Sequence, residues 1–129
     1  MDEKDKKIVE IENYNKILLD GFKSWLQKSN LSLKTIKQHS SNIEFFAEYL
    51  YYYEQVRKLD EAEENDVSSF LTDWYPRKAL WASESNTKSY IASFKKFFKY
   101  LVESNRISPN IEVEVRETLK EYKEEFLES

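Results

Sequence analysis

The sequence predicts an all-α protein, and three observations support this prediction. The 129 residues include one Gly and two Pro, whereas hairpins and sheet corners depend on both residue types. Apolar side chains recur at spacings of three, four and seven residues, which is the period of one helix face. Aromatic residues make up 16% of the chain, so we expect rings, together with Leu and Ile, to fill the core. The pattern predicts a bundle of five helices.

The first helix is expected from about Ile8 to Lys28. Its apolar stripe consists of Ile8, Ile11, Leu18, Phe22, Trp25 and Leu26. Gly21 within this helix costs about 1 kcal/mol relative to Ala, so the helix can break before Phe22. The residues before Ile8 are charged and are expected to fray. We therefore describe residues 1–13 as a charged, partly frayed segment or helix extension, and residues 14–129 as one helical domain.

The second helix is expected to begin after Ser32, whose side-chain oxygen can cap it. Its apolar stripe consists of Ile36, Ile43, Phe46, Tyr49, Leu50 and Tyr53. Asp60 is the expected cap of the third helix, because acidic residues are stabilising at a helix amino terminus. The apolar face of that helix consists of Val67, Phe70, Leu71 and Trp74. We expect the third helix to end at Tyr75–Pro76, since the residue before a proline avoids helical angles.

The fourth helix can be capped by Ser83 or Ser85. Its buried face is predicted to consist of Tyr90, Ile91, Phe94, Phe97, Phe98 and Leu101. The last helix has Ser108 as its expected cap and Pro109 at its first position, where the missing N–H costs nothing. Its apolar residues are Val115, Leu119, Tyr122 and Phe126, which step by four, three and four. This seam either covers the core of the same chain or packs on a second copy or another protein.

The composition bounds the cellular setting. The chain has no Cys, which excludes disulfides and thiolate chemistry and fits a reducing compartment. No apolar run approaches the roughly 18 residues of a membrane span, and the charged amino terminus does not resemble a signal peptide. We predict a cytoplasmic protein without a membrane partner.

The sequence offers little for catalysis. His39 is the only histidine, so a His-plus-carboxylate metal site lacks ligands. No Gly-x-Ser-x-Gly turn and no Gly-rich phosphate-binding loop occurs. We therefore expect no catalytic residue, cofactor, metal or small-molecule substrate, and we place His39 on the surface or on a helix face without a chemical role. The acidic residues between Asp60 and Asp66 lack the pattern of a calcium loop, which favours a solvated helix start.

Charge is distributed unevenly along the chain. The net charge is −4, which as a whole disfavours a polyanionic partner. Residues 59–75 hold six acidic side chains and no basic one, and residues 110–129 hold seven acidic and three basic ones. Between them, residues 76–109 hold seven basic and two acidic side chains, a net charge of +5. One basic block therefore lies between two acidic ones.

The second and fourth helices open with similar hydroxyl-bearing and basic residues, over 32–39 and 85–90. Helix amino termini present free N–H groups and partial positive charge, and Ser, Thr, Asn and Lys side chains there favour phosphate contacts. Lys88, Lys95 and Lys99 recur at seven and four residues, so they share one stripe with Lys96 beside it. The alternative interpretation is that the hydroxyl residues only cap helices and that the lysines form a solvated face.

The stretch from about Leu18 to Leu127 resembles the SAM-like core-binding domain at the amino end of phage-integrase-type tyrosine recombinases. The resemblance rests on the order and spacing of several motifs: Phe22–Leu26, Ser32–Ile36, Asn42–Phe46, Val67–Leu71 and Lys96–Leu101. It implies a single orthogonal bundle of four to five helices. It also implies one half of a clamp around double-stranded DNA, with the second and fourth helices crossing the major groove.

Carried over by position, the resemblance implies phosphate or base contacts from Lys34, Thr35, Lys37 and Gln38, and from Asn86, Thr87 and Lys88. Lys95 and Lys99 would contact the backbone further along the fourth helix. Cutting and rejoining of DNA belong to a separate carboxy-terminal domain in that family, so none of the nine tyrosines is expected to be catalytic.

Two functional hypotheses follow. The first is a non-catalytic DNA-binding domain with weak, salt-sensitive and largely sequence-independent duplex binding. The second is a protein-interaction or regulatory domain that kept the fold and lost DNA binding. The net acidic charge and the apolar seam of the last helix support this second hypothesis. The sequence leaves open whether the chain is a complete protein or a part of a longer recombinase.

Overall fold

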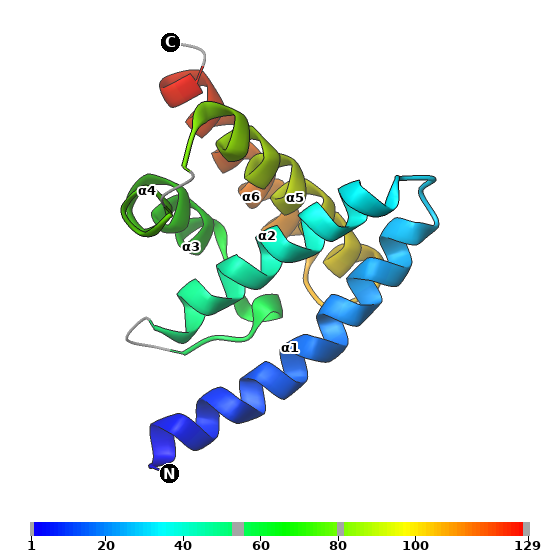
Figure 1. Cartoon of the computed structure of the whole chain (residues 1–129), viewed down its shortest axis with the longest axis vertical. Coiled ribbons are helices and arrows are strands. Elements are labelled where there is room, and N and C mark those ends of the chain that lie inside the picture. The colour runs from blue at the N-terminus through cyan, green and yellow to red at the C-terminus, as the bar shows by residue number, and fades with distance from the viewer. Residues whose placement is uncertain (1, 53–55, 80–81, 128–129) are drawn as a thin grey trace. The chain divides into compact units, whose positions relative to one another are not determined.

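The computed structural model describes residues 2–52, 56–79 and 82–127, and within them it contains helices and no β-strand (Figure 1). The predicted all-α class is therefore confirmed. The chain divides into two compact units, unit 1 with residues 1–61 and unit 2 with residues 62–129. Each unit has its own helices and is described by itself.

Unit 1 is a helical hairpin. Helix α1 (Glu3–Gln27) is followed by helix α2 (Leu33–Tyr51), which packs along it, and by a short 3₁₀ turn, η1 (Leu59–Glu61) (Figure 1). Asn30, in the link, has a φ of 58°, a left-handed conformation that Asn tolerates better than most residues. Most residues of the predicted apolar stripes are buried, with Ile11, Leu18, Phe22 and Leu26 from α1 and Ile36, Ile43, Phe46, Tyr49 and Leu50 from α2. Ile8 and Trp25 of the predicted α1 stripe are half-buried. Tyr53 lies outside the described residues.

Helix α1 begins earlier than the apolar pattern predicts. The Asp2 side chain caps it, since Asp2 Oδ1 accepts a hydrogen bond from the Asp5 N–H at 2.8 Å. Glu3 and Asp5 add negative charge in the first turn, where the helix dipole favours it. The helix therefore includes Glu3 and the residues between it and Ile8, in line with the helix extension that was one of the two alternatives for residues 1–13. The helix also continues through Gly21 without a break. The expected boundary between residues 13 and 14 falls inside this helix.

Unit 2 contains the remaining three predicted helices. Helix α3 (Glu64–Ser69), the π-turn η2 (Phe70–Trp74) and helix α4 (Tyr75–Lys78) follow one another without a gap and correspond to the third predicted helix. They are followed by α5 (Glu84–Glu103), α6 (Pro109–Tyr122) and a second π-turn, η3 (Lys123–Leu127). Helix α6 packs on both α3 and α5.

The core of unit 2 is aromatic around Phe70. The Phe70 ring centroid lies 5.5 Å from that of Tyr90 and 5.7 Å from those of Tyr75 and Phe94. The six predicted core residues of α5 are all buried, as are Val115 and Leu119 of α6. The side chain of Phe126 lies outside the described residues. Because Val115 and Leu119 are buried, part of the seam on α6 is covered.

Both predicted boundaries of the third helix are wrong. Asp60 does not cap the third helix, because it lies in η1 and accepts a hydrogen bond from the Tyr14 hydroxyl. The helix begins after Glu63 instead, whose N–H donates to Asp66 Oδ2 at 2.9 Å. The same helix also continues past Tyr75–Pro76. The Tyr75 N–H donates to the Phe70 carbonyl, five residues back, and this wider turn admits a proline that an ordinary helical turn would exclude.

The other predicted caps are confirmed. Ser32, Ser83 and Ser108 accept hydrogen bonds from the first turns of α2, α5 and α6, and Ser83 rather than Ser85 is the cap of α5.

Candidate functional site

The amino terminus of α2 is ordered by Ser32 and Thr35. Ser32 Oγ accepts a hydrogen bond from the Thr35 N–H at 3.1 Å and donates one to Thr35 Oγ1 at 2.9 Å. The Thr35 side chain is half-buried. Among the predicted contact residues of unit 1, Thr35 therefore shapes the helix start.

Lys34, Lys37 and Gln38 lie next to this cap and are all exposed. The Gln38 amide donates to Asn42 Oδ1 at 2.9 Å, which holds its side chain along the helix. Neither lysine forms an ion pair with any residue that the structure describes. Helical spacing places Lys34, Lys37 and Gln38 within about 100° of one another around the helix axis, so they share one face.

The charge at this helix start is unfavourable for the free protein. The first turn of helix α2 contains Lys34 and no acidic residue. A positive charge near a helix amino terminus costs about 0.3–1 kcal/mol, because it is repelled by the helix dipole. The acidic residues of its exposed face, Glu44 and Glu48, come later. Two unpaired ammonium groups beside free helix N–H groups favour an anionic ligand.

In unit 2 the exposed face of α5 carries the predicted lysine stripe. Lys88, Lys95 and Lys99 are exposed, and Lys96 beside them is half-buried. Lys88 Nζ lies 3.3 Å from Glu84 Oε1. Within the described part of the chain, Lys95 and Lys99 form no ion pair. The stripe is therefore neutralised at its amino end only.

Asn86 and Thr87 lie away from this stripe. Thr87 is buried, and its hydroxyl donates to the Ser83 carbonyl at 2.8 Å. The half-buried Asn86 donates its backbone N–H to Ser83 Oγ at 3.1 Å, and it lies about 160° around the helix from Lys88. The sequence placed these two residues with the lysines because they are neighbours along the chain, whereas the structure turns them toward the helix start and the core.

A basic hollow beside Lys95 is absent from the sequence prediction. It lies between α5 and α6 and is lined by Lys95, Arg116, Glu117 and Lys120. Arg116 Nε pairs with Glu112 Oε1 at 3.4 Å, and the Arg116 side chain is 58% exposed. In the sequence, only the spacing of four residues between Arg116 and Lys120 could have indicated this hollow. The seven acidic residues in 110–129 make that stretch look acidic as a whole.

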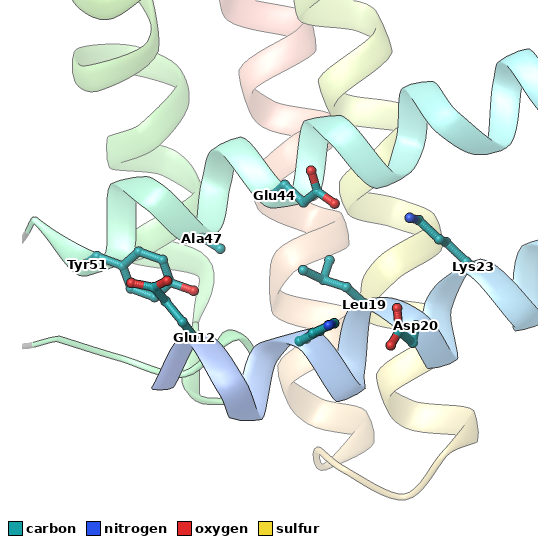
Figure 2. Close-up of a pocket in the computed structure, with 8 residues that line it drawn as sticks. Glu12, Leu19, Asp20, Lys23, Glu44, Ala47 and Tyr51 are labelled. Carbon is teal, nitrogen blue, oxygen red and sulfur yellow. The ribbon is translucent and has the colours of Figure 1, made fainter. Parts of the chain in front are cut away.

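A second concavity lies within unit 1, between α1 and α2 (Figure 2). Its lining mixes both signs of charge and consists of Glu12, Lys16, Leu19, Asp20, Lys23, Glu44, Ala47 and Tyr51. Burial raises the pKa of Tyr51, the charges of Glu12 and Glu48 raise it further, and the hydrogen bond from Asn15 opposes them. Such a mixed lining gives no preference for one class of ion.

The described residues show neither a metal site nor a membrane-spanning helix. In the described ranges no three His, Asp or Glu side chains gather as metal ligands, and no described helix is long and apolar enough to cross a bilayer. His39, expected on the surface or on a helix face, is 6% exposed and therefore belongs to the buried side of α2.

Comparisons with known proteins agree with these helices. Residues 19–105 match the family model described as "Phage integrase, N-terminal SAM-like domain". The chain is also similar to a tyrosine recombinase XerD of Listeria innocua serovar 6a, with 31% identity over 100 residues. The aligned part covers 75% of this chain and 33% of the relative, so the chain matches about a third of that protein's length. No solved structure matches the chain.

Proposed function

Because the chain belongs to the family of phage-integrase N-terminal SAM-like domains, we propose that it is a non-catalytic DNA-binding domain. The observation that carries the proposal is the pair of unpaired lysines at the start of α2. They weaken the free helix and favour an anion, and the DNA backbone is the anion that a recombinase domain meets. The similar protein from Listeria innocua is called a tyrosine recombinase.

The contacts are proposed separately for each unit. In unit 1, Lys34 and Lys37 bind phosphates and Gln38 contacts phosphate or a base edge. In unit 2, Lys88, Lys95 and Lys99 bind phosphates along the backbone, and Asn86 supplies a further polar contact. Thr35 and Thr87 act by fixing the two helix starts, because their hydroxyls are already hydrogen-bonded within the protein.

The proposed binding is weak and depends strongly on salt. Five lysines neutralise at most about five phosphates, and each adds about −0.9 to the slope of log K against log salt concentration. A slope between about −3 and −4.5 and an affinity in the micromolar range or weaker are expected. Phosphate contacts read no sequence, so binding is largely sequence-independent.

The test is fluorescence anisotropy with a labelled duplex of about 20 base pairs at about 50 and 200 mM salt. The test variant is Lys34→Gln/Lys37→Gln/Lys88→Gln/Lys99→Gln. The control variant has the same change of charge on exposed positions of α1: Lys4→Gln/Lys7→Gln/Lys16→Gln/Lys23→Gln. We expect duplex binding to be lost in the test variant and retained in the control.

Two results would contradict the proposal. One is the absence of binding to any duplex at the lower salt concentration, which would favour the alternative of a protein-interaction domain, including self-association. The other is an equal loss of affinity in the two variants, which would show that total charge decides and that α2 and α5 have no special role.

A further inference from the structure

The hollow between α5 and α6 has an unusual charge for its surroundings. It brings together three basic side chains, Lys95, Arg116 and Lys120, and one acidic side chain, Glu117. Apart from Arg116, Glu117 and Lys120, residues 110–129 have six acidic side chains and one basic one. The basic residues of α6 are therefore gathered at the side that faces α5.

Helical spacing explains this separation of charge. Arg116 and Lys120 are four residues apart and lie within about 40° of one another around α6. Glu114 lies about 160° around the helix from Arg116, and Glu121 lies about 100° from Lys120. Glu114 and Glu121 therefore lie on another side of α6, whereas Glu117 lines the hollow and Glu112 pairs with Arg116.

We propose that this hollow, called here the α5–α6 basic hollow, binds a phosphate group of a nucleic-acid backbone. It would extend the DNA-contacting surface of unit 2 from the lysine stripe on α5 to Arg116 and Lys120 on α6. This inference rests on the proposed function of the domain, which assigned no contact to α6.

Arg116 lines the hollow and is held in place by a neighbour on the same helix. Its Nε is held 3.4 Å from Glu112 Oε1, and that Glu112 side chain is only 23% exposed. Glu112 thus anchors the guanidinium, whose flat array of donors suits phosphate oxygens. Lys120 forms no ion pair with a described residue.

Two observations favour a nucleic-acid backbone over an acidic protein segment. The first is continuity, because Lys95 belongs both to the hollow and to the stripe with Lys88 and Lys99. The second is the charge at the hollow, since Lys95, Arg116 and Lys120 still exceed Glu117 and the Arg116 partner Glu112 by one positive charge. A backbone that follows α5 brings successive phosphates past Lys95 and so to the hollow.

The main test compares two double variants of unit 2 in the duplex anisotropy assay. Arg116→Gln/Lys120→Gln removes two charges from the hollow, and Arg77→Gln/Lys78→Gln removes two exposed charges from α4. We expect the first to weaken binding on the order of tenfold at 50 mM salt and to reduce the salt slope by about one to two. The second should change affinity less than about twofold.

The single variant Glu117→Gln changes the hollow in the opposite direction and removes no basic residue. It should tighten duplex binding, with the larger effect at low salt. Circular dichroism of each variant shows whether it folds. If Arg116→Gln/Lys120→Gln does not fold, Glu117→Gln decides, and unchanged affinity in that variant overturns the inference.

Failure of the inference and failure of the proposed function give different results. If the stripe variant Lys88→Gln/Lys99→Gln loses binding but Arg116→Gln/Lys120→Gln does not, the hollow is not a contact and the function stands.

If no duplex binds at all, the proposed function fails, and tripolyphosphate then tests the hollow alone. A saturable shift of the Arg116 Nε–Hε NMR signal, absent at Arg77, supports a phosphate site, and its absence overturns it. Preference for a poly-glutamate peptide over duplex at equal salt also overturns it, in favour of a protein partner.

Discussion

Asn15 and Leu59 are 44 residues apart in the sequence and are joined by a buried hydrogen bond. Asn15 Oδ1 accepts from the Leu59 N–H at 3.0 Å, and Asn15 Nδ2 donates to the Tyr51 hydroxyl at 3.0 Å. Asn15 is 1% exposed and Leu59 is fully buried. One side-chain amide of α1 thus holds both the last residue of α2 and the turn η1, which fixes how the chain returns to α1.

Replacing this amide is expected to destabilise the protein. Asn15→Leu leaves the Leu59 N–H buried without an acceptor, which costs about 1–3 kcal/mol. Urea denaturation measures the loss as a lower transition midpoint. Asn13→Ala is the control, because Asn13 is exposed on the same helix. Equal midpoints for the two variants would mean that water accepts the hydrogen bond of the Leu59 N–H in place of Asn15 without a loss of stability.

A second stability prediction concerns the end of α5. Asn105 has a φ of 59°, and the Arg106 N–H donates to the Leu101 carbonyl at 2.9 Å while the Asn105 N–H donates to the Val102 carbonyl at 3.0 Å. This is the left-handed helix cap that glycine usually supplies. Asn105→Ala should cost about 1 kcal/mol, whereas Asn105→Gly should cost little or nothing.

The measurement is again urea denaturation, with Asn65→Ala as the control. Asn65 is exposed within α3, so an Ala there should be neutral or slightly stabilising. A loss in Asn105→Gly as large as in Asn105→Ala would show that the Asn side chain, and not the backbone angle, is what matters.

The helices were predictable because their information is local. Tyr90, Phe94 and Leu101 repeat at the helical period, and burial on one face follows from that period. Ser32 and Ser108 cap the nearest helix because a cap needs only the next three residues. The order of motifs also sufficed to recognise the family, which the match to residues 19–105 confirms.

The failures involve either partners that are distant in sequence or local backbone geometry that the residue pattern does not show. Asp60 could not be excluded as a cap without knowing that the Tyr14 hydroxyl reaches it. Pro76 ended the predicted helix because the π-turn that admits it is not visible in the residue pattern. For Thr87, which the resemblance gives as a DNA contact, the burial imposed by the packing of α5 could not be read from the sequence. The basic hollow requires α6 to lie against α5, which spacing within either helix cannot show.

A pH prediction follows from the contact between α3 and α6. The charge of the Glu64 carboxylate, followed by a hydrogen bond with it, raises the pKa of Glu114 above its ordinary 4.5, and burial, Glu63 and Glu117 add smaller effects in the same direction. The folded protein therefore binds this proton at a higher pH than the unfolded chain does. Stability consequently rises as the pH falls from neutral through the raised pKa toward 4.5.

Glu114→Gln removes the repulsion at all pH values. At pH 7 the variant should therefore be more stable than the parent protein, and the difference should shrink as the pH falls to about 4. Thermal or urea denaturation at several pH values provides the measurement. Glu121→Gln, an exposed position on the same helix, is the control. A difference that is the same at pH 7 and pH 4 would show that the charge of Glu114 is not its cause.

The last prediction concerns Lys88, the lysine of the α5 stripe that pairs with an acidic side chain among the described residues. Glu84 lies in the first turn of α5, where its charge stabilises the helix, and its carboxylate is 3.3 Å from Lys88 Nζ. If Lys88 binds a DNA phosphate, Glu84 competes for it and repels the backbone. Glu84→Gln should therefore tighten duplex binding about two- to fivefold at 50 mM salt, with a smaller effect at 200 mM.

The same substitution should lower stability, because the helix start loses its acidic residue, by about 0.3–1 kcal/mol. Affinity and stability thus change in opposite directions, which a general effect on folding would not produce. Glu103→Gln removes the same charge from the other end of α5 and serves as the control in both measurements. Equal tightening by the two variants would attribute the gain to net charge, whereas tightening by Glu84→Gln alone would identify Lys88 as a phosphate contact whose affinity Glu84 limits.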